Sequence, residues 1–332
     1  MNNLIKKFQV FGLFSPKYYS IVLSKIELKL AYMRKEISQV KLKKANEKYC
    51  HSFYKFFKKH INDSYFKTNN VKPLKNVVFV YRDSGLETMP KIARLCFERL
   101  KAVTRFEIIL IDKSNIQEYS CIDPEILSMY RDGEISLTMF SDILRYNLLA
   151  IHDCIWIDST VFLREDFPSD ILNYDFISPY CEKGKSLFDN KPELYKYPDL
   201  SVSQNYFLAG KKKEIFSKWY DLTVAYLKSE TTFLKLARPY YLTYFVFEFL
   251  NDEDIEFKKN LENRMPSNEN AECIEGLKDE IYDSSKYGYI FSSDTFLFKL
   301  SYKMDFKAIK NNKLTVFGKF LETYNISEND VI

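Results

Sequence analysis

Three charged residues in the middle of this 332-residue chain could act together on a polar substrate. Asp142 and Arg145 are three positions apart, so a helix would project both from the same face. Asp158 follows the apolar run 154–157, which is typical of a buried strand. Carboxylates at such positions can hold a divalent metal or a sugar hydroxyl, and a guanidinium binds oxygen anions. The alternatives are an exposed ion pair on the helix and a capping or turn aspartate after the strand.

The segments around these residues predict an α/β layer. β-rich runs alternate with helical patterns in the order strand, helix, strand, helix, strand, which is typical of a doubly wound α/β fold. Strands are expected at residues 77–81, 106–111 and 154–157, and helices at 89–103 and 138–151. Because ligands bind at the carboxyl ends of strands in such sheets, segments 82–85, 112–114 and 158–160 should point at one place. Residues 206–209 and 296–300 predict two further strands.

The net charge of +4 conceals a strong asymmetry along the chain. Residues 1–70 carry fifteen Lys and Arg against four acidic residues, a net charge of +11, and the remainder therefore carries −7. Apolar residues at helical spacings make residues 1–70 a basic amphipathic helical arm, and residues 71–325 form the main domain. These apolar residues are Ile21, Leu28, Leu30, Tyr32, Ile37 and Val40. The arm could contact an anionic membrane, or it could be a solvated helix that packs on the domain.

Composition excludes several classes of protein. Hydrophobic residues make up 46% of the chain, too many for a disordered protein. The six cysteines have no C-x-x-C spacing and there are only three histidines, so Cys and His predict no zinc site. No apolar run approaches the ~20 residues needed to span a bilayer. We expect a cytoplasmic protein that binds no nucleic acid, because the domain is acidic and no nucleic-acid module is recognisable.

The central block resembles a known family. Ser141-Asp142-Ile143-Leu144-Arg145, followed by residues 155–162, resembles bacterial capsular polysaccharide synthesis glycosyltransferases, which are similar to glycosyltransferase family 32. The same S-D-x-x-R helix with a following aspartate motif occurs in the glucosyltransferase domain of large clostridial toxins. Met89-Pro90 and the segments 207–211 and 298–303 also look like family features. The resemblance spans roughly residues 75–320, in order.

This resemblance implies a GT-A type fold, a Rossmann-like mixed sheet flanked by helices that binds a nucleotide-sugar. It implies that Asp142 accepts hydrogen bonds from sugar hydroxyls and that Arg145 contacts the sugar or the diphosphate. Asp158 would be the first residue of a D-x-D motif and would hold Mn²⁺ or Mg²⁺. Residues expected to bind the donor are Tyr81, which could stack on the base, Gly85, Ser141, Thr160 and Ser301. We expect Asp142, Arg145 and Asp158 to converge on one pocket with Ser301 nearby.

The implied activity is transfer of a hexose, with retention of configuration, from a nucleotide-sugar to a lipid-linked oligosaccharide. Such a reaction belongs to capsular or other cell-surface polysaccharide synthesis, and it would place the protein peripherally at the inner face of the plasma membrane. The alternative is a degenerate, non-catalytic member of the same fold that binds a nucleotide-sugar or glycan.

Two departures from the family pattern motivate that alternative. Thr160 stands at the third position of D-x-D, and threonine is a weaker metal ligand than a carboxylate. Metal dependence is therefore open, with Ser301 or water as possible additional ligands. The residues His152-Asp153-Cys154 stand where the family has Tyr-Gly-Gly. We expect Asp153 to preserve the turn by adopting a positive φ angle, and His152 to pack in place of the tyrosine.

Overall fold

The computed structural model describes most of the chain. The described residues are 19–33, 39–68, 71–179, 205–229, 235, 238–239, 242–262 and 270–331. Among these residues, no helix combines the length and apolar character needed to cross a membrane.

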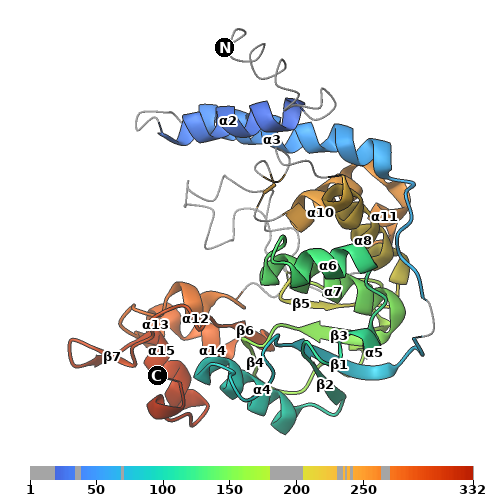
Figure 1. The fold of residues 1–332 in the computed structure, drawn as a ribbon. Coiled ribbons are helices and arrows are strands. Elements are labelled where there is room, and N and C mark those ends of the chain that lie inside the picture. The colour runs from blue at the N-terminus through green and yellow to red at the C-terminus, as the bar shows by residue number, and fades with distance from the viewer. Residues whose placement is uncertain are drawn as a thin grey trace.

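A four-stranded mixed sheet forms the centre of the domain (Figure 1). The strands are β1 (Lys75–Tyr81), β2 (Glu107–Ile111), β3 (Asp153–Ile157) and β5 (Phe207–Ala209), in the order β2-β1-β3-β5. The first three are parallel, and β5 pairs antiparallel with β3. The predicted α/β class, with a mixed sheet flanked by helices, is therefore confirmed.

Helices cover both faces of this sheet because its central strand is apolar on both sides. In β1, Val77 and Phe79 pack with helix α7 (Leu137–Ile151), whereas Val78 and Val80 pack with helix α4 (Lys91–Val103). This alternation follows from the two-residue period of a strand. Helices α8 (Lys213–Lys228) and α10 (Leu242–Glu253) lie beyond α7, on the side away from α4 (Figure 1).

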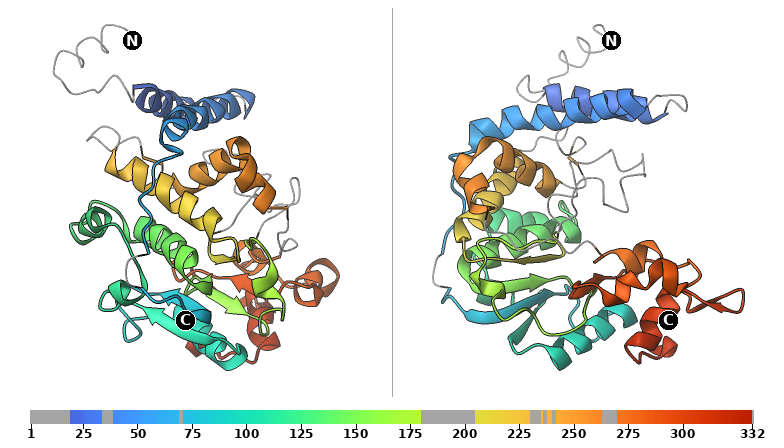
Figure 2. Two further views of the ribbon diagram at one scale, coloured as in Figure 1. Left: turned by 90° about the vertical axis from the view of Figure 1, so that its right-hand side faces the viewer. Right: turned by 180° about the vertical axis from the view of Figure 1, so that it is seen from behind.

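The C-terminal segment adds a further lobe beside α4 (Figure 2). Strand β4 (Val161–Leu163) pairs antiparallel with β6 (Leu297–Lys299), so Phe162 lies opposite Phe298. Both phenylalanines are buried in a cluster with Phe320. The remaining named elements are α5 (Ile116–Tyr119), α6 (Pro124–Arg131), η2 (Ile171–Asn173), α11 (Ile255–Asn260), α12 (Cys273–Gly276), α13 (Ser284–Tyr287), α14 (Tyr289–Ser292), β7 (Ile309–Lys310), β8 (Lys313–Leu314), α15 (Val316–Thr323) and η4 (Glu328–Asp330).

The basic arm forms two helices that lie across one end of the domain, α2 (Tyr19–Met33) and α3 (Gln39–His60) (Figure 1). On α3, the fully buried ring of Phe53 lies 5.1 Å from the ring of Phe245 on α10 and 5.7 Å from that of Tyr226 on α8. Packing of the arm against the domain is thus confirmed for α3.

The apolar pattern that predicted the arm is only partly buried. Ile21 and Leu28 on α2 join the core, whereas Leu30 is 47% exposed. Ile37 and the first 18 residues lie outside the described residues.

Candidate active site

A cavity of about 270 Å³ opens at the carboxyl ends of β1 and β3. The ends of these strands, the first turns of α7 and the segment after β6 all contribute to its wall. Six of the predicted site residues line it: Tyr81, Ser141, Arg145, Asp158, Thr160 and Ser301. The structure therefore brings most of the predicted site together, as expected. Asp142 and Gly85 do not line the cavity.

Helix α7 delivers Ser141 and Arg145 to this cavity. The Ser136 hydroxyl caps the helix by accepting a hydrogen bond from the Met139 amide at 3.2 Å. The helix is covered by the sheet on one side and by α8 on another, so both Asp142 and Arg145 are buried. The alternative of an exposed ion pair is wrong, because the two side chains are only 9% and 5% exposed.

Arg145 is the centre of a buried ionic cluster. Its Nη2 lies 3.1 Å from Asp142 Oδ1 and 3.3 Å from Asp158 Oδ1, so one guanidinium joins the helix to the end of β3. Nη1 donates to the carbonyl of Asn205, and the guanidinium lies 5.0 Å from the ring centre of Trp156. Burial alone would lower the pKa of Arg145, but Asp142 and Asp158 raise it above its ordinary value. Arg145 therefore remains a cation.

Asp142 lies behind Arg145, away from the cavity wall. Burial raises the pKa of its carboxyl to about 6, although Arg145 opposes that rise. Its second oxygen accepts a hydrogen bond from the Thr243 hydroxyl at 3.2 Å. The contacts of Asp142 thus orient Arg145 from behind, and the expected contact with sugar hydroxyls stays a prediction.

Asp158 is held from two sides. Its Oδ1 accepts a hydrogen bond from Trp156 Nε1 at 3.0 Å, and its Oδ2 lies 3.3 Å from Lys299 Nζ. The same ammonium donates to Thr160 Oγ1 at 2.6 Å. Sequence reasoning missed Lys299 as a site residue, although it falls inside the predicted strand 296–300. Only the pairing of β6 with β4, which no local pattern reveals, brings it beside Asp158.

The D-x-D positions offer few ligands for the expected divalent metal. Mg²⁺ requires near-octahedral coordination, with carboxylates as its usual protein ligands. Here the first and third positions of the motif offer one carboxylate and one hydroxyl, with the Lys299 ammonium between them, and Asp83 and Glu275 line the same cavity. Within the described part of the chain, no group of three or more His, Cys, Asp and Glu side chains could hold a metal ion.

The turn after β1 shapes the entrance to the cavity. Gly85 has a φ angle of +71°, and its amide donates to the Arg82 carbonyl at 2.9 Å. Tyr81 is 7% exposed, and its hydroxyl lies 3.1 Å from both Asp83 Oδ1 and Tyr130 Oη. The expected stacking of Tyr81 on a base therefore does not match the geometry, because its ring is buried beside Phe140.

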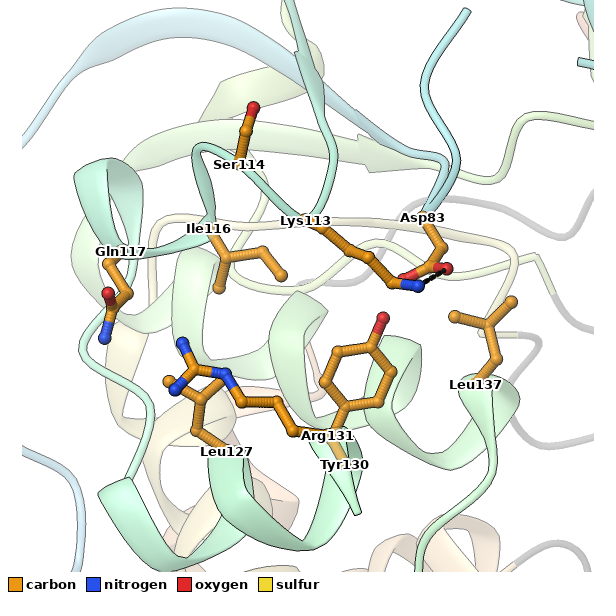
Figure 3. Close-up of a pocket in the computed structure, with 9 residues that line it drawn as sticks. All are labelled: Asp83, Lys113, Ser114, Ile116, Gln117, Leu127, Tyr130, Arg131 and Leu137. Carbon is orange, nitrogen blue, oxygen red and sulfur yellow. Dashed lines mark ion pairs between the residues drawn. The ribbon is translucent and has the colours of Figure 1, made fainter. Parts of the chain in front are cut away.

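A second cavity of about 370 Å³ lies next to the first, at the ends of β1 and β2 (Figure 3). Asp83 and Leu137 line both cavities, so the two share a wall. An ion pair of 2.9 Å between Lys113 and Asp83 crosses this region. Of the strand-end segments expected at one place, 82–85 reaches both cavities, whereas 112–114 lines only the second and 158–160 only the first. Sequence reasoning missed the contributions of Tyr130 and Arg131 from α6.

The substitution of Tyr-Gly-Gly by His152-Asp153-Cys154 is accommodated structurally. His152 is 1% exposed; its Nδ1 accepts from the Leu74 amide at 3.0 Å, and its Nε2 lies 2.7 Å from the Tyr119 carbonyl. Packing of His152 is thus confirmed. The expected positive φ at Asp153 is wrong, because this residue begins β3 and is not among the described residues with positive φ. It forms an ion pair of 2.9 Å with Lys213 instead.

These hydrogen bonds make stability depend on the neutral form of His152. Burial lowers its pKa below the ordinary value of 6.5. As the pH falls below 6.5, the unfolded chain gains a proton that the folded chain does not, so the free energy of unfolding decreases. The slope is at most about 1.4 kcal/mol per pH unit, until the pH reaches the folded pKa.

We expect His152→Gln to flatten this dependence, because glutamine can replace both hydrogen bonds without titrating. Urea unfolding of both proteins between pH 7.5 and 5 gives the difference between their free energies of unfolding at each pH. Carboxylates titrate in both proteins, so their contribution cancels in this difference. Parallel stability profiles would contradict the prediction.

The fold and site together define a class of protein with a polar cleft at the carboxyl edge of an α/β sheet, lined by both basic and acidic side chains. Clefts of this kind bind anionic or polar small molecules. The sequence model of the capsular polysaccharide synthesis protein family matches residues 27–320, and the chain belongs to this family. The match includes most of the basic arm as well as the domain.

Comparison with solved structures gives a distant similarity. A solved structure titled PaToxG Glycosyltransferase is similar at 16% identity over 71% of this chain and 83% of that one, with a TM-score of 0.35. Comparison with curated proteins gives no match.

Proposed function

We propose that this protein is a nucleotide-sugar-dependent glycosyltransferase that transfers a hexose, with retention, to a lipid-linked oligosaccharide. The observation that carries the proposal is the convergence of Arg145 and Lys299 on Asp158 within a cleft that adjoins a second cavity. Membership of the capsular polysaccharide synthesis family supports the same chemistry.

Sugar transfer from a nucleotide-sugar releases a nucleoside diphosphate, whose negative charge must be stabilised as the bond breaks. Arg82, Arg145, Lys299 and Lys303 all line the first cavity and can supply positive charge there. The adjoining cavity offers the polar groups of Ser114, Gln117 and Arg131 for the nucleoside. The two cavities share a wall, which suits a donor with a nucleoside at one end and a sugar at the other.

Asp158 would act at the sugar end. A carboxylate beside the reacting carbon stabilises the oxocarbenium-like charge that develops as the glycosidic bond breaks. A reaction with retention does not require a base on the opposite face of the sugar ring. The ion pairs of Asp158 with Arg145 and Lys299 fix the direction of its carboxylate.

We extend the proposal to the acceptor and the membrane. Helix α3 carries exposed lysines, two of which, Lys48 and Lys58, pair with glutamates; the others suit an anionic lipid headgroup region, where a lipid-linked acceptor would be presented. These lysines are Lys44, Lys48, Lys55, Lys58 and Lys59.

We expect the intact protein to hydrolyse at least one member of a panel of UDP- and GDP-sugars slowly when no acceptor is present. Asp158→Asn should lower that rate by about 10²- to 10³-fold, because the substitution removes the negative charge at the reacting centre. The rate is measured by mass spectrometry of the released sugar, with circular dichroism as the check on folding.

The outcome also separates the two functional hypotheses. A non-catalytic member of the fold would bind a nucleotide-sugar without turning over any donor. If wild-type protein and Asp158→Asn release sugar at the same rate, the proposed role of Asp158 is wrong.

A further inference from the structure

Lys299 reaches the site through the register of the β4–β6 pair. Val161, the first residue of β4, lies opposite Lys299, the last residue of β6. The Leu300 amide then donates to the Thr160 carbonyl at 2.9 Å, which fixes the strand end against the turn 158–161. Backbone pairing therefore holds Lys299 beside this turn, and its side chain is only 22% exposed.

The ammonium of Lys299 bridges the first and third side chains of the Asp158-Ser159-Thr160 motif. It donates to Thr160 Oγ1 at 2.6 Å and lies 3.3 Å from Asp158 Oδ2. Glu275 lines the same cavity, and Lys299 opposes the rise in its pKa that burial causes. In a D-x-D motif, the first and third residues would face a divalent cation. Here a lysine lies between them.

The other oxygen of Asp158 is also engaged. Trp156 Nε1 donates to Oδ1 at 3.0 Å, and Arg145 Nη2 lies 3.3 Å from the same atom. A metal placed between Asp158 and Thr160 would have to displace the Lys299 ammonium, and Thr160 would bring no negative charge to hold the metal. An ammonium has three N–H donors. In Lys299, two of them are used by the hydrogen bonds to Asp158 and Thr160 within the described chain.

We propose that Lys299, held by Asp158 and Thr160, replaces the divalent cation and binds the diphosphate of the donor through its remaining N–H group. This inference rests on the proposed glycosyltransferase function. Under this proposal the transfer reaction needs no metal, because Lys299 supplies the positive charge that faces the diphosphate.

The transfer step can be written with the Lys299 ammonium as the cation that faces the diphosphate. The bond between the anomeric carbon and the diphosphate oxygen breaks, and its electron pair stays on that oxygen. The acceptor hydroxyl oxygen forms the new bond to the anomeric carbon, and its proton passes to the departing diphosphate. Lys299 keeps its own proton throughout and stabilises the charge that develops on the diphosphate.

The test measures nucleotide binding by calorimetry, using UDP and GDP with UMP and GMP as comparisons. Wild-type protein should bind one diphosphate equally well in EDTA and in Mn²⁺. Lys299→Met should weaken that binding about 10- to 100-fold, as expected for loss of a charged hydrogen bond, and should change binding of the matching monophosphate less than threefold. Lys218→Met is the matched control, because Lys218 is also partly buried and paired with an aspartate but lies outside the cavity.

Two further variants keep the test decisive. Lys299→Arg retains the charge and should bind in EDTA even if Lys299→Met does not fold. The double variant Thr160→Asp with Lys299→Ala restores D-x-D, and its nucleotide binding should require Mn²⁺, detected independently as loss of the free Mn²⁺ signal in electron paramagnetic resonance.

The failures are distinguishable. Wild-type binding that requires Mn²⁺, or unchanged binding by a folded Lys299→Met, would overturn this inference alone. Binding of neither diphosphate under any condition would overturn the proposed function as well.

Discussion

Arg145→Met is expected to abolish activity and to lower the free energy of unfolding by about 3–5 kcal/mol. The energetic cost follows from burial, because the substitution leaves the carboxylate of Asp142 in the core with, among the described residues, the Thr243 hydroxyl as its remaining hydrogen-bond partner. Donor hydrolysis should fall by about 10²- to 10³-fold, because Asp158 loses one of its two cationic partners and the diphosphate loses a cation.

A double-mutant cycle separates the two effects. Adding Asp142→Asn to Arg145→Met removes the uncompensated charge, so the double variant should recover about 0.5–3 kcal/mol of stability while its activity stays low. Lys101→Met is the control for an exposed ion pair, since Lys101 and Glu98 are each 50% exposed. Its unfolding free energy should change by less than about 1 kcal/mol. If Arg145→Met changes neither the free energy of unfolding nor the rate of donor hydrolysis, the proposed role of Arg145 in the buried cluster is wrong.

Phe53→Ala should destabilise the whole protein by about 3–5 kcal/mol, although Phe53 belongs to the arm. Its ring is fully buried, and four aromatic rings surround it, those of Tyr49, Phe57, Tyr226 and Phe245. Removing the ring leaves a cavity that these large side chains cannot fill without moving together. Thermal unfolding followed by circular dichroism and by tryptophan fluorescence measures the effect.

The matched control for this prediction is Leu30→Ala on α2. Leu30 is 47% exposed, so its truncation should cost less than about 0.5 kcal/mol. If Phe53→Ala melts α3 in a separate step and leaves the transition of the domain unchanged, the arm is an independent unit.

The sequence allowed the parallel strands and the edge of the sheet that carries the candidate site to be predicted because these depend on local patterns. The runs 77–81, 106–111 and 154–157 correspond to β1, β2 and β3, and the polar residues after each strand line the two cavities. The location of these polar residues at a common edge could also be predicted, because parallel strands of one sheet have their carboxyl ends at the same edge.

Features that depend on contacts between residues far apart in the sequence could not be predicted from local patterns. The burial of Asp142 and Arg145 follows from α8 and the sheet covering α7, whereas the helical spacing alone favoured an exposed pair. Lys299 reaches Asp158 across 141 positions of sequence through one strand pairing. The tyrosine expected to face a base is buried, because Phe140 on α7 occupies the space beside it.

The distance in sequence between Asp158 and Lys299 has a consequence for a newly made chain. At 5–20 residues per second, the ribosome needs roughly 7–30 s to extend from one residue to the other. During that interval the first three strands can already pair, while Asp158 lacks its ammonium partner. The cleft therefore acquires its full complement of charges only after β6 has been made, so a chain truncated before β6 would leave Asp158 with Arg145 but without Lys299.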